Sequence, residues 1–263
     1  MKQFILNNEP DKNGQVRLEN SDYRYLVRVR RLAPREYFHA LLPGGGEVLV
    51  RVCSVDNNVL VGEIVRSVHA EAASKRSMPP IILFQALPKG EKMDLIVRQA
   101  AEGGLAEIVP FASEFSAVKI EKPETDTGKW QKFSRWERII KEARQQSGSA
   151  TATIVRQPMS MDSLFAYWEQ IKEEQPEVLG LFFHHLPLAN ESLHGYLSKR
   201  FGMVVLAIGP EGGFSSNETE RFLTAGFKPF TIGDTILRTE TAALYMAAAV
   251  RILLLEKDSW KLK

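Results

Sequence analysis

Residues 209–214 have the sequence Gly-Pro-Glu-Gly-Gly-Phe and come directly after an apolar run, Met203–Ile208. The run is typical of a buried strand, and Ser215 and Glu218 have the spacing of a capping box at the start of a helix. Parallel sheets bind ligands at the carboxyl ends of their strands, where glycine lets the backbone approach a ligand closely. The pattern therefore predicts a ligand-binding loop.

Two other interpretations of this glycine loop stay open. The loop could be only a tight structural turn, or it could hold a phosphate at the N-terminus of the following helix. The charge of Glu211 would repel a phosphate, and the loop has no lysine like that of a P-loop.

A second polar loop begins near Ile232 and runs to Thr241, and it also joins an apolar run to a helix start. Either Thr239 or Thr241 could cap the last helix. Arg238 and Glu240 could form a structural ion pair beside this helix, or they could supply charged groups to a pocket. Loops after successive parallel strands lie at one edge of the sheet, so we expect the two loops to share a pocket.

Apolar strands alternate with amphipathic helices after residue 80, and these elements must position the two loops. The uninterrupted apolar run 81–86 is typical of a parallel strand covered on both faces. Strands are predicted at 81–86, 107–110, 153–156, 178–183, 204–208 and 230–232, and helices at 92–102, 129–146 and 241–255. This order predicts an α/β domain with a largely parallel sheet.

The N-terminal part of the chain has shorter periods. Alternating valines predict strands at 48–53 and 59–65, and a helix is expected at 23–32 with Ser21 or Asp22 as its cap. These elements are typical of a small barrel or sandwich.

The segment 70–80 is small and polar and then proline-rich, which is typical of a domain boundary. We therefore expect one domain at 1–72 and a second at 78–263.

Arginines are concentrated in one short stretch of the first domain. The formal net charge of the whole chain is only +2, so the chain as a whole is not a general polyanion binder. Arginine recognises phosphates through paired hydrogen bonds, but a short basic run could also be a solvated face. The arginines are Arg24, Arg28, Arg30, Arg31 and Arg35.

The single cysteine, Cys53, excludes an internal disulfide and a cysteine-rich zinc site, and it is consistent with a reducing, cytoplasmic setting. Its place among alternating valines predicts a core or half-buried side chain. The N-terminus has no signal-peptide pattern, and the longest apolar candidate for a membrane span, 242–255, is interrupted by Arg251.

The histidines and tryptophans have weaker claims to chemistry. His184 and His185 end an apolar strand, where they could border the pocket or could simply face solvent. We expect no metal, because His39, His69 and His194 lack neighbouring metal ligands. Trp130, Phe133 and Trp136 have helical spacing, which favours a core position over a base-stacking platform.

The two late motifs, GPEGGFS at 209–215 and ILRTETAAL at 236–244, resemble the RsmE family. This family comprises the 16S ribosomal RNA (uracil-N3)-methyltransferases of the SPOUT class. The segments 89–94, 108–111 and 136–147 are similar to the same family, and the resemblance covers most of residues 80–255.

The resemblance implies methylation of uridine N3 in small-subunit ribosomal RNA, with S-adenosyl-L-methionine as cofactor. It implies an α/β fold with a SPOUT-type trefoil-knotted parallel sheet and an N-terminal PUA-like β-barrel that binds RNA. It also implies a cytoplasmic homodimer with each active site at the subunit interface, acting on ribosomal RNA or the small ribosomal subunit.

Three groups of residues are assigned to the site. From the chemistry of N3 methylation, we expect Arg238 to hold the uracil or a phosphate and Glu240 to remove a proton or to orient Arg238. The basic run supplies the expected RNA-binding residues Arg24, Arg28, Arg30 and Arg31. The resemblance implies the cofactor-binding residues Leu206, Ile208, Gly209, Gly213, Ile232, Gly233, Leu237, Arg238 and Thr239.

Two alternative functions stay open: another SPOUT enzyme, such as a ribose 2′-O-methyltransferase, and a non-catalytic RNA-binding factor in ribosome assembly. The chain departs from the family pattern at Gln3, Tyr25, Tyr37 and Ser149, mostly in regions expected to face RNA.

Overall fold

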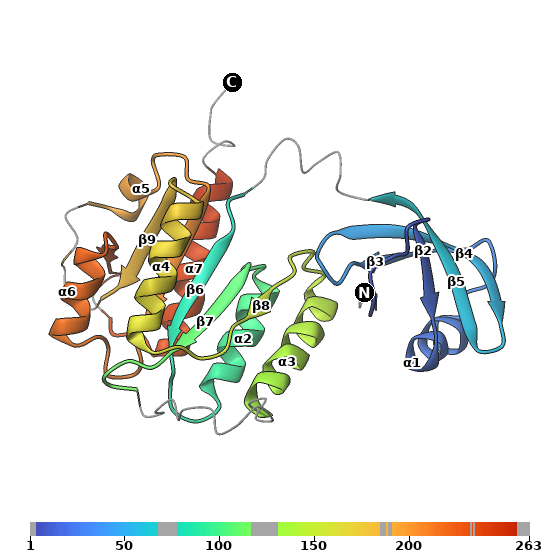
Figure 1. The fold of residues 1–263 in the computed structure, drawn as a ribbon, viewed down its shortest axis with the longest axis horizontal. Coiled ribbons are helices and arrows are strands. Elements are labelled where there is room, and N and C mark those ends of the chain that lie inside the picture. Colours follow the sequence, from blue (N-terminus) through green and yellow to red (C-terminus); the bar gives the residue numbers. More distant parts are fainter. Residues whose placement is uncertain are drawn as a thin grey trace. The chain divides into compact units, whose positions relative to one another are not determined.

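The protein is described by a computed structural model that covers residues 4–67, 78–116, 131–184, 188, 191–231, 233 and 235–256 (Figure 1). The chain forms two compact units. The first unit comprises Met1–Ser77 with Arg144–Ala152, and the second comprises Met78–Ala143 with Thr153–Lys263.

The first unit contains a curled five-stranded sheet with the strand order β1-β3-β4-β5-β2 (Figure 1). β1 and β3 are parallel, and the other pairs are antiparallel. The predicted strands 48–53 and 59–65 are confirmed inside β4 and β5. The strands are β1 Phe4–Ile5, β2 Gln15–Leu18, β3 Tyr37–Leu41, β4 Glu47–Asp56 and β5 Val59–Ser67.

The helix predicted at 23–32 is present, but it begins and ends earlier and changes form. A short α-helix, α1 (Asn20–Tyr23), continues as one π-helical turn, η1 (Arg24–Val29). The expected cap at Ser21 or Asp22 is wrong, because Glu19 precedes the first turn and makes no side-chain cap. The helix does not continue through Arg31, whose φ of 59° lies in the left-handed region.

The expectation of a core or half-buried Cys53 is also wrong, because this residue is exposed. Side chains on a strand alternate between faces, and Val50 and Val52 of β4 point into the core. Cys53 therefore shares the outer face of β4 with Arg51.

The second unit is built on a six-stranded sheet with the order β11-β9-β10-β6-β7-β8 and parallel pairing throughout. The predicted α/β class with a parallel sheet is confirmed. The strands are β6 Ile81–Ala86, β7 Glu107–Phe111, β8 Ile154–Val155, β9 Val178–Phe183, β10 Met203–Ile208 and β11 Lys228–Phe230. The helices are α2 Lys92–Glu102, α3 Gln131–Ser147, α4 Met161–Glu174, α5 Leu193–Tyr196, α6 Ser216–Thr224 and α7 Thr239–Glu256.

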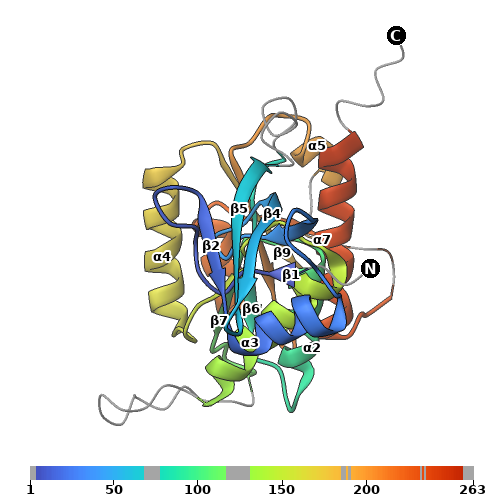
Figure 2. The same cartoon turned by 90° about the vertical axis from the view of Figure 1, so that its right-hand side faces the viewer.

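Helices cover both faces of this sheet, which explains the unbroken apolar strands (Figure 2). In β10, Leu206 and Ile208 belong to the core that includes residues of α2, α3 and α7. Val205 and Ala207 belong to the opposite core, with residues of α4 and α6. Each strand therefore needs apolar residues at successive positions.

The structure differs from prediction at the two elements beside the second loop. β11 ends at Phe230, where a strand at 230–232 was expected, and α7 begins at Thr239 rather than 241. The predicted boundary near 70–80 lies largely outside the described residues. Within the described ranges, no helix combines the length and apolar character needed to span a bilayer.

Candidate active site

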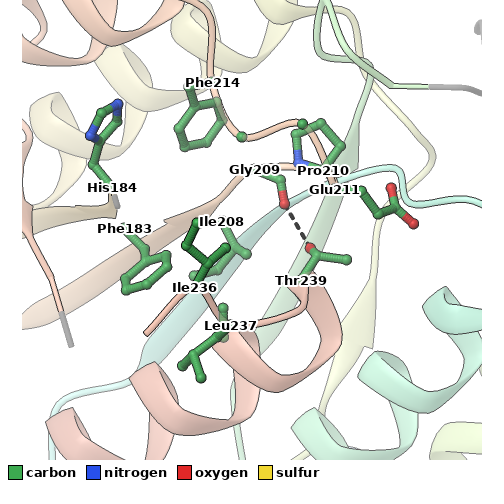
Figure 3. Close-up of a pocket in the computed structure, with 13 residues that line it drawn as sticks. Phe183, His184, Ile208, Gly209, Pro210, Glu211, Phe214, Ile236, Leu237 and Thr239 are labelled. Carbon is green, nitrogen blue, oxygen red and sulfur yellow. Dashed lines mark hydrogen bonds between the residues drawn. The ribbon is translucent and has the colours of Figure 1, made fainter. Parts of the chain in front are cut away.

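A cavity of about 180 Å³ lies beside the carboxyl ends of β9 and β10 and the start of α7 (Figure 3). Both polar loops identified in the sequence contribute to it, as expected. The lining residues are Phe183, His184, Ile208, Gly209, Pro210, Glu211, Gly212, Gly213, Phe214, Ile236, Leu237, Thr239 and Ala242.

The glycine loop folds back on itself immediately after β10. The N–H of Gly213 donates to the carbonyl oxygen of Pro210 at 2.9 Å and closes a turn. A Cβ atom at Gly209 would lie 3.0 Å from the carbonyl carbon of Gly213, and Gly213 itself has a φ of 71°. The turn therefore requires glycine at both positions: a side chain at Gly209 would clash with the backbone, and the φ of Gly213 is strained for other residues.

The predicted capping box at α6 is confirmed. The N–H of Glu218 donates to Ser215 Oγ at 3.2 Å, and the Glu218 carboxylate accepts from the N–H of Ser215 at 2.9 Å. The same buried carboxylate also accepts from Ser113 Oγ at 3.2 Å and from the N–H of Glu114 at 2.8 Å. Glu218 thus fastens the loop after β7 to the end of the glycine loop.

Thr239 connects the two pocket loops. Its hydroxyl donates to the carbonyl oxygen of Gly209 at 2.6 Å (Figure 3). The same hydroxyl accepts from the side-chain amide of Gln85 at 3.0 Å. The side chain of Thr239 therefore binds the glycine loop and the end of β6, so it is not the N-cap that the sequence suggested.

Glu211 directs its carboxylate to α2. It accepts from Lys92 Nζ at 2.6 Å and from the backbone N–H of Lys89 at 3.1 Å. Partial burial alone would raise the pKa of Glu211, but the hydrogen bonds from Lys92 and the backbone hold this pKa below its ordinary value. A fixed negative charge on the loop disfavours a phosphate ligand, in agreement with the sequence analysis.

Arg238 and Glu240 occupy different environments. Arg238 is exposed, and the described residues include no ion-pair partner for it, so the structural ion pair with Glu240 is not found there. Glu240 is mostly buried and lies 4.0 Å from Lys92 Nζ through Oε2. This oxygen is buried and has no hydrogen-bond partner in the described part of the chain.

Five of the residues predicted to bind the cofactor line the cavity: Ile208, Gly209, Gly213, Leu237 and Thr239. Three others do not. Leu206 is fully buried in the core, two residues before Ile208 on the same face of β10. Gly233 and Arg238 are exposed and are not among the lining residues. Ile232 lies outside the described residues.

Sequence reasoning missed Phe183 as a wall residue. It ends β9, which is paired with β10, and this adjacency was the signal that could have identified it. His184 lines the cavity with 8% of its surface exposed. Of the two possibilities for this residue, bordering the pocket or facing solvent, the structure shows the first. His185 lies outside the described residues.

The other aromatic and histidine predictions concern structure. Trp136 is buried, as expected, and its indole N–H donates to Asp94 at 2.9 Å, while Phe133 is partly buried against the same core. Trp130 and His69 lie outside the described residues. No cluster of potential metal ligands occurs among the residues whose positions are given.

The arginines of the first unit face solvent around η1. Arg24, Arg28 and Arg31 are exposed and Arg30 is half-buried. None of the four has an ion pair with a residue in the described ranges, in contrast to Arg17, which pairs with Glu19 at 2.6 Å. Tyr25, one of the departures from the family pattern, stacks on Phe4 and therefore has a packing role.

The comparisons with known proteins identify the family. Residues 75–251 match the model of the RNA methyltransferase domain. A ribosomal RNA small subunit methyltransferase E from Aquifex aeolicus is 32% identical over 82% of this chain and 86% of that protein. The enzyme of the same description from Synechocystis sp. is 29% identical over 91% of this chain and 73% of its own length.

A crystal structure from Neisseria gonorrhoeae is similar along nearly the whole chain. That protein is a ribosomal RNA small subunit methyltransferase E bound to S-adenosyl methionine. It is 26% identical, with a TM-score of 0.71, over 96% of this chain and 98% of that one. The resemblance found in the sequence is therefore confirmed, and the chain belongs to the RNA methyltransferase domain family, among the ribosomal RNA small subunit methyltransferase E enzymes.

Proposed function

We propose that this enzyme transfers a methyl group from S-adenosylmethionine to N3 of a uridine in small-subunit ribosomal RNA. The observation that carries the proposal is the single cavity formed by the glycine loop and the start of α7, which are joined by the hydrogen bond from Thr239 to Gly209. The related protein from Neisseria gonorrhoeae, which binds S-adenosyl methionine, supports the choice of ligand.

The residues of the cavity suit this cofactor. Ile208, Leu237 and Ala242 form apolar walls for the adenine ring and the methionine chain, while the glycine loop offers backbone polar groups. A Cβ at Gly213 would meet no atom within 4 Å, so this position leaves open space beside the loop. Of the other predicted cofactor residues, we propose that Leu206 supports the wall from behind.

S-adenosylmethionine supplies an already activated methyl group, so the protein contributes mainly alignment and the exclusion of water. Uridine N3 carries a proton and becomes a good nucleophile only when that proton is removed or strongly polarised. N3 also lies on the pairing edge of the base, so the target uridine must be unpaired or flipped out of a helix.

Arg238 and Glu240 are the groups that we assign to this proton chemistry. The exposed guanidinium of Arg238 is available to hold the uracil or a phosphate. Glu240 does not line the cavity, and its buried Oε2 has no hydrogen-bond donor among the described residues. Both assigned roles, proton removal and the orientation of Arg238, therefore need the Glu240 side chain to turn towards the bound RNA.

We propose that the first unit binds the RNA through Arg24, Arg28, Arg30 and Arg31. Arg24, Arg28 and Arg31 are exposed and Arg30 is half-buried. None of them pairs with a carboxylate of the described residues, which keeps their hydrogen-bond donors available for phosphate oxygens. A ribosomal RNA substrate would place the enzyme in the cytoplasm.

We also propose that two copies of the chain pair through α7, which would complete each active site at the interface. Large apolar side chains are exposed on this helix, and a cavity of about 120 Å³ lies beside it against α2. The exposed residues are Leu244, Tyr245, Ile252 and Leu255.

Nucleoside mass spectrometry of small-subunit ribosomal RNA tests the proposed reaction. A strain that lacks this gene should lose one 3-methyluridine, and the wild-type gene should restore it, whereas Arg238→Ala should not. Loss of a ribose methylation would instead indicate a 2′-O-methyltransferase. Unchanged nucleosides, together with no S-adenosylmethionine binding by calorimetry, would favour the non-catalytic assembly factor.

A further inference from the structure

Gln85 is a polar exception in the central strand of the parallel sheet. It lies in β6, between Ile208 of β10 and Pro110 of β7, and its exposed fraction is 0%. Its Oε1 has no hydrogen-bond partner among the described residues. An unsatisfied buried carbonyl destabilises the folded state, so an apolar side chain would fit this position better on stability grounds alone.

The orientation of the Gln85 amide is determined by its neighbours. Nε2 lies 2.9 Å from the carbonyl oxygen of Ala86, which can only accept a hydrogen bond. The second hydrogen of Nε2 is then directed at Thr239 Oγ1, 3.0 Å away. Because the amide nitrogen cannot accept, Gln85 must be the donor in this contact.

This fixed donor determines where Thr239 directs its own proton. With Gln85 donating to Oγ1, the hydroxyl hydrogen of Thr239 is available for the carbonyl oxygen of Gly209, 2.6 Å away. The three groups form a buried relay in one direction, from the end of β6 through α7 to the glycine loop. Thr239 is itself only 4% exposed, so water does not compete for its hydroxyl.

We propose that Gln85 is a positioning residue for the cofactor pocket. It fixes the rotamer and the donor direction of Thr239, and through Thr239 it holds the Gly209 peptide in the conformation that binds the ligand. The proposal rests on the proposed function only in naming S-adenosylmethionine as that ligand. Gln85 itself does not line the cavity, so it acts through Thr239.

Calorimetric titration of S-adenosylmethionine into the purified protein tests the proposal. We expect Gln85→Met, which keeps the size but removes the donor, to raise Kd by about 10-fold, because a displaced pocket wall loses ligand contacts. Thr239→Val should have a similar effect, and Thr239→Ser, which keeps the hydroxyl, should remain close to wild type. The double variant Gln85→Met/Thr239→Val should be no weaker than either single variant, because both interrupt the same relay.

Thr153→Val is a matched control. The hydroxyl of Thr153 also donates to a backbone carbonyl, that of Leu105, at 2.6 Å, and Thr153 is 6% exposed. This contact lies beside the amino end of β8, away from the pocket lining. The control should lower Tm without changing Kd. Rate measurements should show the same separation, with a raised KM for S-adenosylmethionine and a nearly unchanged kcat for Gln85→Met.

Hydrogen–deuterium exchange of the ligand-free protein keeps this inference separate from the proposed function. Amides in 209–214 should exchange faster in Gln85→Met and Thr239→Val than in wild type or Thr153→Val. Unchanged exchange and an unchanged Kd in Gln85→Met would overturn the proposal, as would additive effects in the double variant. If the wild-type protein binds no S-adenosylmethionine, the proposed function fails, and the exchange rates still decide the role of Gln85.

Discussion

The hydroxyl of Thr239 donates to the carbonyl oxygen of Gly209 across 2.6 Å, although the two residues are 30 positions apart in the chain. The bond is buried and joins the first residue of α7 to the first residue of the glycine loop, directly after β10. The two loops that line the cavity therefore form one wall, and a change at either end should be measurable as a change in ligand affinity.

Gly209→Ala should weaken S-adenosylmethionine binding by about 10-fold or more, because small displacements of a binding wall have large effects. The new Cβ would lie 3.0 Å from the carbonyl carbon and 3.1 Å from the Cα of Gly213, and backbone atoms cannot move aside as a side chain can. Calorimetry measures the affinity. Gly226→Ala is the control. It strains a left-handed residue (φ 91°), but its new Cβ would contact no atom within 4 Å, and Gly226 lies away from the pocket lining. The control should therefore lower Tm and leave Kd unchanged. Equal affinities for the two variants would contradict this explanation.

Glu211→Gln should weaken the attachment of the glycine loop to α2 in a pH-dependent way. Partial burial opposes ionisation, but the hydrogen bonds from Lys92 and from the N–H of Lys89 lower the pKa of Glu211 below its ordinary value of 4.5. Because the pKa of Glu211 is lower in the folded protein than in the unfolded chain, its ionisation stabilises the fold above pH 4.5. This stabilisation is lost as the pH falls through the pKa of the folded state. The pair is partly exposed, so we expect a difference in unfolding free energy below about 1 kcal/mol at pH 7. Urea titrations should show this difference vanish in acid, and a difference that persists at low pH would exclude the ion pair as its cause.

Tyr167→Phe should destabilise the second unit by about 1 kcal/mol, the usual net contribution of an intramolecular hydrogen bond. The hydroxyl of Tyr167 donates to Glu107 at 2.9 Å and accepts from Arg156 at 2.9 Å, while Arg156 also pairs with Glu107. Burial, followed by the charge of Glu107, raises the pKa of Tyr167 to about 12 from an ordinary 10.0. Because the pKa of Tyr167 is higher in the folded protein than in the unfolded chain, the protonated hydroxyl stabilises the fold below pH 10. This stabilisation is lost as the pH rises towards 12.

Absorbance titration of the tyrosines checks this prediction. The wild-type protein should have one tyrosine that ionises about two pH units later than an ordinary one, and this component should be missing from Tyr167→Phe. A late-ionising component that persists in Tyr167→Phe would show that it does not come from the cluster with Glu107.

Elements with strong local patterns were predictable, and the supporting contacts of the site were not. The bounds of β6, α2 and β9 agree with the prediction, because an unbroken apolar run or a helical stripe ending at Gly103 specifies each of them. Gln85 carries no such signal: within an apolar strand, a single glutamine does not reveal that it meets Thr239, 154 positions later.

The position of β11 and the environment of Glu240 depended on tertiary structure in the same way. β11 is only three residues long, so its register depends on the pairing of Phe230 with Phe183 in β9. Proximity in sequence suggested Arg238 as the partner of Glu240, but among the described residues it is Lys92 of α2 that lies 4.0 Å from the Glu240 carboxylate. Periodicity predicts elements, whereas such long-range contacts are determined only when the elements pack.

Arg28→Ala and Arg24→Ala should each weaken RNA binding about uniformly across sequences and reduce the slope of log K against log salt by about 1, the signature of one lost phosphate contact. Fluorescence anisotropy with a small-subunit RNA fragment, measured from low to physiological salt, gives both quantities. Arg138→Ala is the matched control, because Arg138 is an exposed arginine of α3 that already lies 4.0 Å from the carboxylate of Glu142. The control should leave the slope unchanged. Equal slopes for all three variants would mean that η1 carries a solvated basic face, and the RNA-binding surface would then have to lie elsewhere on the protein.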